Sequence, residues 1–324
     1  MNKVRLALVA GLLLAAAIDL STPARLRAPA AAPVMPDTPR ELAAWVTARE
    51  RAIDKAQRII PGAEKRIRWF AGGERTPYSV VYLHGFSATR QETAPLAEQV
   101  ADALGANLFE TRLAGHGLSD DPLTGIRAED WLADGVESLE IGRRLGEQVI
   151  LIATSTGATL AAALLEEPGM SDVDSIVMIS PNFAPRDARA AWLTAPGGPL
   201  VARLVAGSER SWQAHNELQA RFWTTRYPTA AAVEMMRLVD RANRVWPKAL
   251  SQRLLVFYSR DDAVVSAETT LAMIGETGAG DKTLIEVPDS GDPSRHVLAG
   301  DILSPATTDR VVESIAGFIL RRGP

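Results

Sequence analysis

The chain has 324 residues, an apolar fraction of 47% and a formal net charge of −4. A chain of this length can form one large domain with an insertion, or two ordinary domains, around a sizeable core. The weakly negative charge gives no basic surface field of the kind that binds nucleic acid, so no nucleic-acid partner is expected. Because the chain has no cysteine, disulfides, thiolate catalysis and cysteine-ligated zinc are excluded.

The first 38 residues indicate a leader and a linker. Lys3 and Arg5 precede an unbroken apolar run at 6–18, a pattern typical of secretory signal peptides. Thirteen helical residues reach about 20 Å, short of the roughly 30 Å hydrocarbon layer, so a membrane-spanning helix is not expected. We expect an exported protein, periplasmic or secreted, with a candidate cleavage site at 28–30. An uncleaved N-terminal anchor and a cytoplasmic protein with an apolar leader are the alternatives.

Five prolines at 23–39 predict an extended, solvated linker, followed by a charged helix at 41–60. Short aliphatic runs then alternate with helical patterns that include 96–104, stopped by Gly105, and a final helix around 311–319. The runs read as buried strands: 79–83, 108–111, 149–152, 176–179, 254–258 and 284–287. This alternation predicts a doubly wound, mostly parallel α/β core in two parts, 39–185 and 252–324.

The interval 186–251 breaks that alternation, because it contains helical patterns but no convincing strand. It predicts a helical cap inserted into the core. The cap holds four of the seven tryptophans: Trp192, Trp212, Trp223 and Trp246. Such a concentration suits an apolar lid over a pocket, although each tryptophan could equally belong to a small core within the cap.

Ser155 lies between an apolar strand and an alanine-rich helix, where a nucleophile elbow is expected. The sharp turn requires small residues two positions before and after the serine, and Ala153 and Gly157 meet that requirement. The turn would also place the serine oxygen at a helix N-terminus, which favours developing negative charge. The alternative is that Ser155 and its threonine neighbours only cap the helix.

A serine hydroxyl needs a base and an orienting acid to become a good nucleophile. Asp262 follows the strand at 254–258, at the sheet edge where open α/β sheets build their sites. Asp261 is the second candidate, and a turn-forming aspartate is the structural alternative. Of the four histidines, His296 alone lies beyond this acid, which makes it the candidate base.

The oxyanion of an acyl-transfer intermediate needs two fixed backbone donors, and the N–H groups of Phe86 and Thr156 are the candidates. His84 and His116 occur in tight His-Gly loops and are expected to be structural. The histidines are dispersed along the chain, so no paired-ligand spacing supports a zinc site.

With these residues in place, the chain resembles the α/β-hydrolase superfamily, and within it the carboxylesterase and monoacylglycerol-lipase branch. The resemblance covers about 67–320 and is strongest at 83–87, 113–119, Asp130-Trp131 with Asp134, the Ser155 turn, Asp262 and His296. It implies an eight-stranded, mostly parallel sheet, no metal or organic cofactor, and acyl transfer to water through an acyl-enzyme. Ala153 departs from the family pattern, which usually has glycine there.

An esterase or lipase that acts on a small-molecule or lipid ester is therefore expected. A peptidase resembling proline iminopeptidase would need acidic residues in the cap, whereas 186–248 holds ten Lys or Arg against five Asp or Glu. A non-catalytic binding protein on the same fold is a third interpretation. The basic and aromatic cap also suits peripheral contact with an anionic membrane, and a solvated basic face is the alternative.

Overall fold

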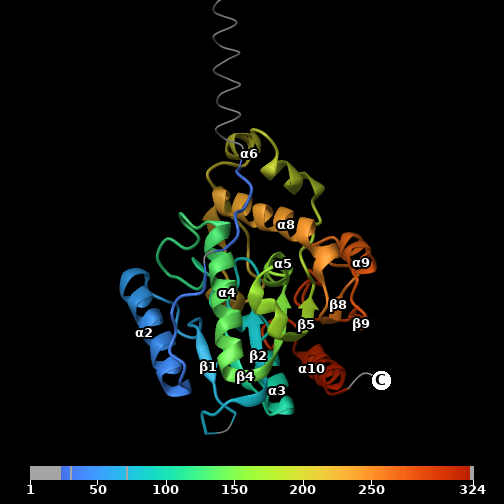
Figure 1. Ribbon diagram of the computed structural model, residues 1–324. Helices are drawn as coiled ribbons and strands as arrows, with labels where there is room; N and C mark the ends of the chain where they lie inside the picture. The colour runs from blue at the N-terminus through green and yellow to red at the C-terminus, as the bar shows by residue number, and fades with distance from the viewer. Residues whose placement is uncertain (1–22, 30, 71, 322–324) are drawn as a thin grey trace, which may run out of the picture.

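The computed structural model describes residues 23–29, 31–70 and 72–321 (Figure 1). The predicted leader at 1–22 and part of the candidate cleavage site lie outside these residues. Among the helices described, none combines the length and the apolarity that a membrane crossing requires.

The core is a seven-stranded sheet of order β1-β3-β2-β4-β5-β8-β9. Its strands are β1 (Arg66–Arg68), β2 (Thr76–Leu83), β3 (Asn107–Glu110), β4 (Gly146–Thr154), β5 (Val173–Ile179), β8 (Arg253–Tyr258) and β9 (Lys282–Glu286). Only β1 pairs antiparallel. The six predicted runs are confirmed, but β1 was not predicted. The eight-stranded sheet that the resemblance implied was wrong for the described residues, which form seven strands in this sheet.

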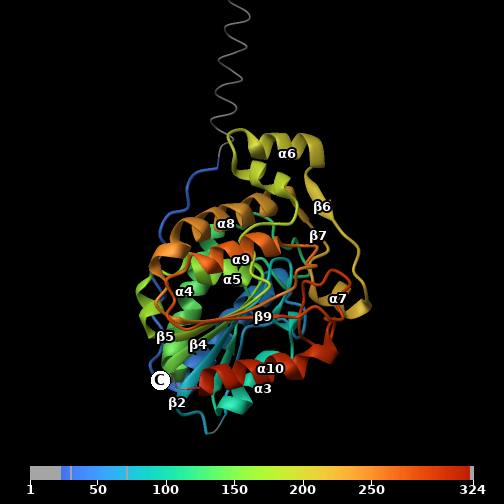
Figure 2. The same cartoon turned by 90° about the vertical axis from the view of Figure 1, so that its right-hand side faces the viewer.

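Helices cover both faces of the sheet, as the alternation predicted (Figures 1 and 2). They are α2 (Pro39–Gln57), α3 (Leu96–Leu104), α4 (Ala128–Leu145), α5 (Thr156–Ala163), α8 (Thr229–Ala249), α9 (Ala267–Gly275) and α10 (Pro305–Leu320). Alternate strand residues face opposite layers, so Val81 and Leu83 pack with α4, α5 and α8, whereas Val80 and Tyr82 pack with α3 and α10. As predicted, α3 ends at Gly105, whose φ of 63° suits glycine.

The segment at 23–38 is extended but packs against the fold, so its prediction as a solvated linker was wrong. Leu26 and Met35 are buried in the main core cluster. Arg237 donates to the Ala24 carbonyl at 3.0 Å, and Arg144 donates to the Pro36 carbonyl at 3.1 Å. These arginine contacts satisfy carbonyls of a segment that has no helix or strand of its own.

The region between β5 and β8 contains η3 (Ala188–Thr194), α6 (Gly198–Ala206), β6 (Glu209–Ser211), α7 (Glu217–Phe222), β7 (Arg226–Pro228) and α8. The expectation of no strand here was wrong, because β6 and β7 form a small antiparallel pair. The four tryptophans of this region do not form one cluster. Trp246 is fully buried against Phe183, Trp223 is buried and Trp212 partly buried beside the Ser87 loop, and Trp192 is exposed.

Candidate active site

Ser155 lies in the sharp turn between β4 and α5, with φ 52° and ψ −116°. A non-glycine residue rarely adopts a positive φ, so the surrounding contacts must hold this strained turn. A Cβ on Gly157 would lie 2.2 Å from the Leu83 carbonyl oxygen, which explains why glycine is needed two positions after the serine. Ala153 is fully buried in register with Leu83 and Met178, so a methyl group fits where the family pattern has glycine.

Three side chains from separate loops meet at this turn. The Nε2 atom of His296 lies 2.9 Å from Ser155 Oγ, and its Nδ1 atom lies 2.8 Å from Asp262 Oδ2. All three residues are buried, with 6%, 7% and 2% exposure for Ser155, His296 and Asp262. Asp261, the second candidate acid, is exposed and does not bond to His296 among the described contacts.

Backbone amides fix the orientation of the acid. Asp262 Oδ1 accepts hydrogen bonds from the Val264 and Val265 amides, both at 2.8 Å. This leaves Oδ2 directed at the imidazole, so Asp262 can hold one ring tautomer, with the proton on Nδ1 and the lone pair on Nε2.

The backbone of His296 is held by residues that the sequence did not identify. Asp292 Oδ2 accepts from the His296 and Val297 amides at 2.9 and 2.8 Å, and Ser180 Oγ donates to the His296 carbonyl at 2.7 Å. Asp292 lies in the loop that the sequence placed before the base, but its role depends on a turn that spacing alone does not reveal.

Two opposing effects act on the pKa of His296, the candidate base. Burial would lower the pKa of His296, but the Asp262 carboxylate and, more weakly, Glu92 and Asp292 raise it above its usual value. A base with a raised pKa accepts the serine proton more readily, provided that the ring is neutral at the working pH.

Glu92 is a second buried acid beside the site that the sequence missed. Its Oε2 atom accepts from the Gly85 amide at 2.7 Å, in the loop that carries Phe86. A Cβ on Gly85 would lie 2.8 Å from Glu92 Oε1 and 3.2 Å from Ser155 Cβ, so the loop passes between the two. Burial raises the pKa of Glu92 to about 7.

The candidate oxyanion donors, Phe86 and Thr156, flank Ser155 on two different segments. Within the described part of the chain, neither amide makes a hydrogen bond to another protein group. The Phe86 ring packs edge to face against Tyr227 of β7, with the ring centroids 5.1 Å apart. It packs in the same way against His116 and Trp131. The cap therefore reaches the loop that holds one of the two donors.

His84 and His116 have structural surroundings, as expected. His84 Nε2 accepts from the Leu113 amide at 3.0 Å, which leaves Nδ1 to donate to the Gly85 carbonyl at 2.9 Å. Burial lowers the pKa of His84 well below its usual value and that of His116 to about 4. Both rings are therefore neutral near neutral pH.

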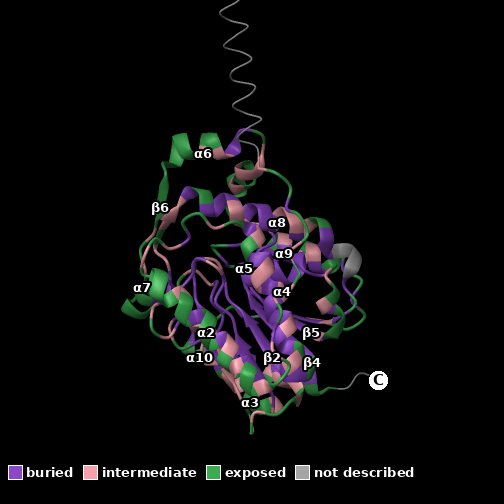
Figure 3. Ribbon diagram, turned by 60° about the vertical axis from the view of Figure 1, so that its left-hand side comes forward, coloured by how far each residue is buried: buried purple, intermediate pink, exposed green. Residues whose placement is uncertain are grey.

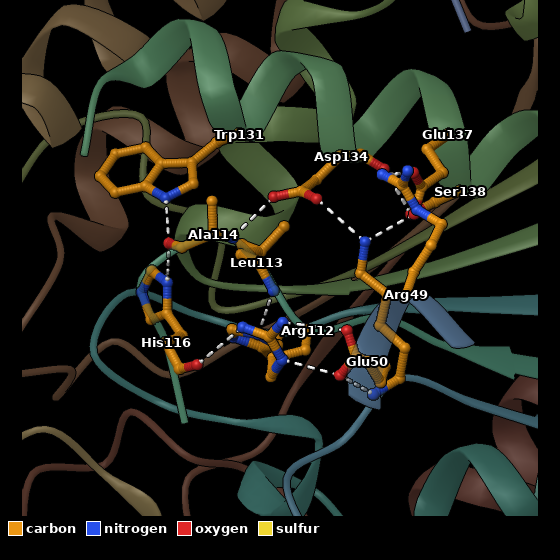
Figure 4. A network of polar contacts seen from close by, with 12 residues as sticks. Arg49, Glu50, Arg112, Leu113, Ala114, His116, Trp131, Asp134, Glu137 and Ser138 are labelled. Carbon is orange, nitrogen blue, oxygen red and sulfur yellow. Dashed lines mark hydrogen bonds and ion pairs between the residues drawn. The ribbon is translucent and has the colours of Figure 1, made fainter. Parts of the chain in front are cut away.

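A buried polar network connects the loop at 112–117 to helices α2 and α4 (Figure 4). Arg112 forms two hydrogen bonds to Glu50 of α2, at 2.8 and 2.9 Å, and donates to the His116 carbonyl. Asp134 of α4 accepts from the Ala114 amide at 2.6 Å and pairs with Lys65. The loop that packs on His84 and Phe86 is thus held by two helices.

The cap contributes further contacts next to Ser155. The Thr224 amide donates to the Ser87 carbonyl at 2.6 Å. Asn182 Nδ2 lies 3.3 Å from Met235 Sδ on α8 and 3.4 Å from Thr156 Oγ1. Among the described residues, no group of three or more His, Asp or Glu side chains is arranged to hold a metal ion.

Comparisons with known proteins identify the family of this fold. A family model described as the alpha/beta hydrolase family matches residues 80–305. A thermostable monoacylglycerol lipase from Bacillus sp. (strain H-257) is 27% identical over 259 residues, which cover 80% of this chain and 96% of the relative.

Solved structures share the fold. A structure from work on LipS and LipT, two metagenome-derived lipolytic enzymes, has a TM-score of 0.67 at 21% identity and covers 82% of this chain and 100% of its own. The Paleococcus ferrophilus monoacylglycerol lipase has a TM-score of 0.58 at 15% identity, covering 79% and 97%. Because the family model spans more than half of the sequence, the chain belongs to the alpha/beta hydrolase family.

Proposed function

We propose that the protein hydrolyses carboxylic esters through an acyl-enzyme on Ser155, with His296 as the base and Asp262 as the acid that orients it. The observation that carries this proposal is the Asp262–His296–Ser155 relay, at 2.8 and 2.9 Å, on a strained turn at a helix N-terminus. Both distances lie in the range needed for proton transfer in the resting site.

In the first half-reaction, His296 Nε2 takes the Ser155 proton while Oγ attacks the ester carbonyl carbon. The carbonyl π electrons move to oxygen, and the amides of Phe86 and Thr156 donate hydrogen bonds to the resulting oxyanion. Collapse of this intermediate expels the alcohol oxygen, which takes the proton from His296. The acyl group is then bonded to Ser155.

In the second half-reaction, His296 removes a proton from water, and the water oxygen attacks the acyl carbon. The second tetrahedral intermediate collapses, the carboxylic acid leaves, and the proton on His296 returns to Ser155 Oγ. Asp262 remains ionised throughout and stabilises the imidazolium that forms twice in each cycle.

The substrate class that we propose is an ester with one acyl chain. The named relatives are a monoacylglycerol lipase and lipolytic enzymes, and the cap adds Tyr227 and Met235, an aromatic and a thioether side chain, beside the site. A peptidase that binds a substrate amino group would need free carboxylates in the cap. Of the five carboxylates at 186–248, Asp187, Glu209 and Glu234 pair with an arginine, so at most Glu217 and Asp240 are left for such a role.

Covalent labelling tests the proposal. A fluorophosphonate probe should label the native protein and the Ser171→Ala control, whose serine is exposed and remote from the relay. Ser155→Ala should lose both labelling and the hydrolysis of p-nitrophenyl esters while it keeps its melting temperature. Labelling of the Ser155→Ala variant would assign the nucleophile elsewhere, and absence of labelling in the native protein would favour a non-catalytic binding protein. A series of acyl-chain lengths would then define the preferred ester.

A further inference from the structure

Helix α6 is an apolar helix that the described part of the chain leaves uncovered (Figure 3). Leu204, Val205 and Val201 are 77%, 83% and 52% exposed, and Trp192 in the preceding turn is 70% exposed. Together with Leu200 we call these five residues the α6 face. Large apolar side chains are rarely exposed in such a cluster unless another surface covers them.

The α6 face carries almost no charge. Arg203 is the one charged residue between 190 and 208. Other basic residues of the cap turn toward acids: Arg189 pairs with Asp187, Arg226 with Glu209, Arg237 with Glu129 and Glu234, and Arg241 with Glu167. Four of the ten basic residues at 186–248 thus pair with acids within the fold, and Arg203 alone belongs to the stretch at 190–208.

The first described residues of the N-terminal segment lie next to this helix. Pro23 and Ala24 line a cavity of about 630 Å³ together with Pro199, Leu200 and Arg203. The apolar run at 6–18 is five residue steps from Pro23, a reach of at most about 18 Å at roughly 3.6 Å per residue. The apolar run is thus joined to the described chain, by a short connection, at a point that lies beside α6.

We propose that the α6 face docks on the surface of a lipid bilayer, beside the N-terminal apolar run. A bilayer covers both elements at once, because α6 can lie in the interface with its apolar side chains among the acyl chains while the run inserts next to it. Two weak membrane signals together give firmer binding than either alone. With a single cation on the face, the apolar contact rather than the charge provides the attraction, unlike the electrostatic docking expected from the cap's composition.

The absence of cysteine allows a direct test on the full chain with one polarity-sensitive fluorophore attached at Leu204→Cys. The matched control is Leu320→Cys, which is 58% exposed at the end of α10, far from α6 (Figure 2). With phosphatidylcholine vesicles, the label at 204 should shift to the blue and brighten several-fold, while the label at 320 stays unchanged. Addition of phosphatidylglycerol or of 0.5 M salt (roughly a 4 Å screening length) should change the shift little.

Three results would overturn the proposal. A label at 204 that stays in water while the protein sediments with vesicles would mean that the N-terminal run anchors the chain alone. A blue shift without lipid that grows with protein concentration would assign the face to a second copy of the chain. A shift that needs anionic lipid and disappears with salt would restore electrostatic docking.

The enzymatic consequence rests on the proposed function, whereas the fluorescence result does not. Leu204→Glu with Val205→Glu should hydrolyse a soluble short-chain ester at the native rate. With a monoacyl ester embedded in vesicles, its rate should fall about tenfold, equal to roughly 1.4 kcal/mol. An inactive native protein whose 204 label still shifts would refute the ester hydrolase and leave the docking surface intact.

Discussion

The carboxyl edge of the sheet and helix α6 differ in how the fold surrounds their side chains. At the sheet edge, the three relay residues are buried and have defined partners; Asp262, for example, contacts two amides and an imidazole. Along α6, the side chains are apolar and exposed, and the described chain supplies little to cover them. The relay is thus held by contacts within the described fold, whereas the α6 face lacks such contacts and is, in our proposal, covered by a bilayer.

The largest expected effect concerns the acid of the relay. Asp262→Asn should lower kcat for ester hydrolysis by about 10,000-fold, because an amide at this position favours the wrong imidazole tautomer. Asp261→Asn, one residue away and exposed, should keep a rate within about twofold of the native protein. Steady-state kinetics of both variants measure the difference. Equal losses would show that the loop, and not the Asp262 carboxylate, determines the rate.

The next effect concerns the buried Glu50–Arg112 pair, which supports the loop at 112–117. Glu50→Ala should reduce the free energy of unfolding by about 3–5 kcal/mol, because Arg112 would remain buried without its carboxylate. Arg51→Gln, on the exposed side of α2, should change it by less than about 0.5 kcal/mol. Urea denaturation measures both. A small loss for Glu50→Ala would mean that the loop at 112–117 is held by Asp134 and Trp131 alone.

Glu92 should make stability depend on pH. Its pKa is about 7 in the folded protein against a usual value of 4.5. The folded protein therefore binds more protons than the unfolded chain between these values, and its stability falls as the pH rises through this window. Glu92→Gln keeps an acceptor for the Gly85 amide but removes the titration.

The stability gained by Glu92→Gln relative to the native protein should therefore grow between pH 4.5 and 7, to on the order of 3 kcal/mol. Glu74→Gln, at an exposed position, is the control and should show no such trend. Unfolding free energies measured across this pH range decide between the two. A flat difference for Glu92→Gln would mean that Glu92 ionises as it does in water.

The smallest effect is expected at α6. Leu204→Glu with Val205→Glu should shift the melting temperature by less than about 2 °C in the absence of lipid, because the folded chain gives these side chains few contacts. Leu151→Glu, which places a charge in the fully buried β4, should prevent folding. A large destabilisation by the α6 variant would show that this helix packs against the fold in solution.

The sequence was sufficient where local chemistry and chain order determine the outcome. Ser155, Asp262 and His296 follow the ends of β4, β8 and β9, and parallel strands bring those ends to one edge, so the three side chains could be expected to meet. Gly157 was likewise required by the geometry of the turn. The strands of the parallel sheet were equally predictable from their β-branched and aliphatic runs, because such strands are buried on both faces.

Other features depend on partners that are distant in the sequence. Glu92 reads as an ordinary charged residue until the fold buries it under the Gly85 loop. Strands β1, β6 and β7 have only three residues each and contain charged or polar side chains, so no apolar period marks them. The segment at 23–38 was misread because its prolines predict an extended backbone correctly, but do not show whether that backbone is covered.

That docked segment also has a consequence for maturation. A peptidase needs several extended, accessible residues on both sides of the bond that it cleaves. In the folded protein, however, Leu26 is buried and the Ala24 carbonyl is bound by Arg237, just before the small residues at 28–30. If the predicted signal peptide is cleaved there, Leu26 and the Ala24 carbonyl must first come away from the fold, so cleavage is expected to be faster before the chain folds than after.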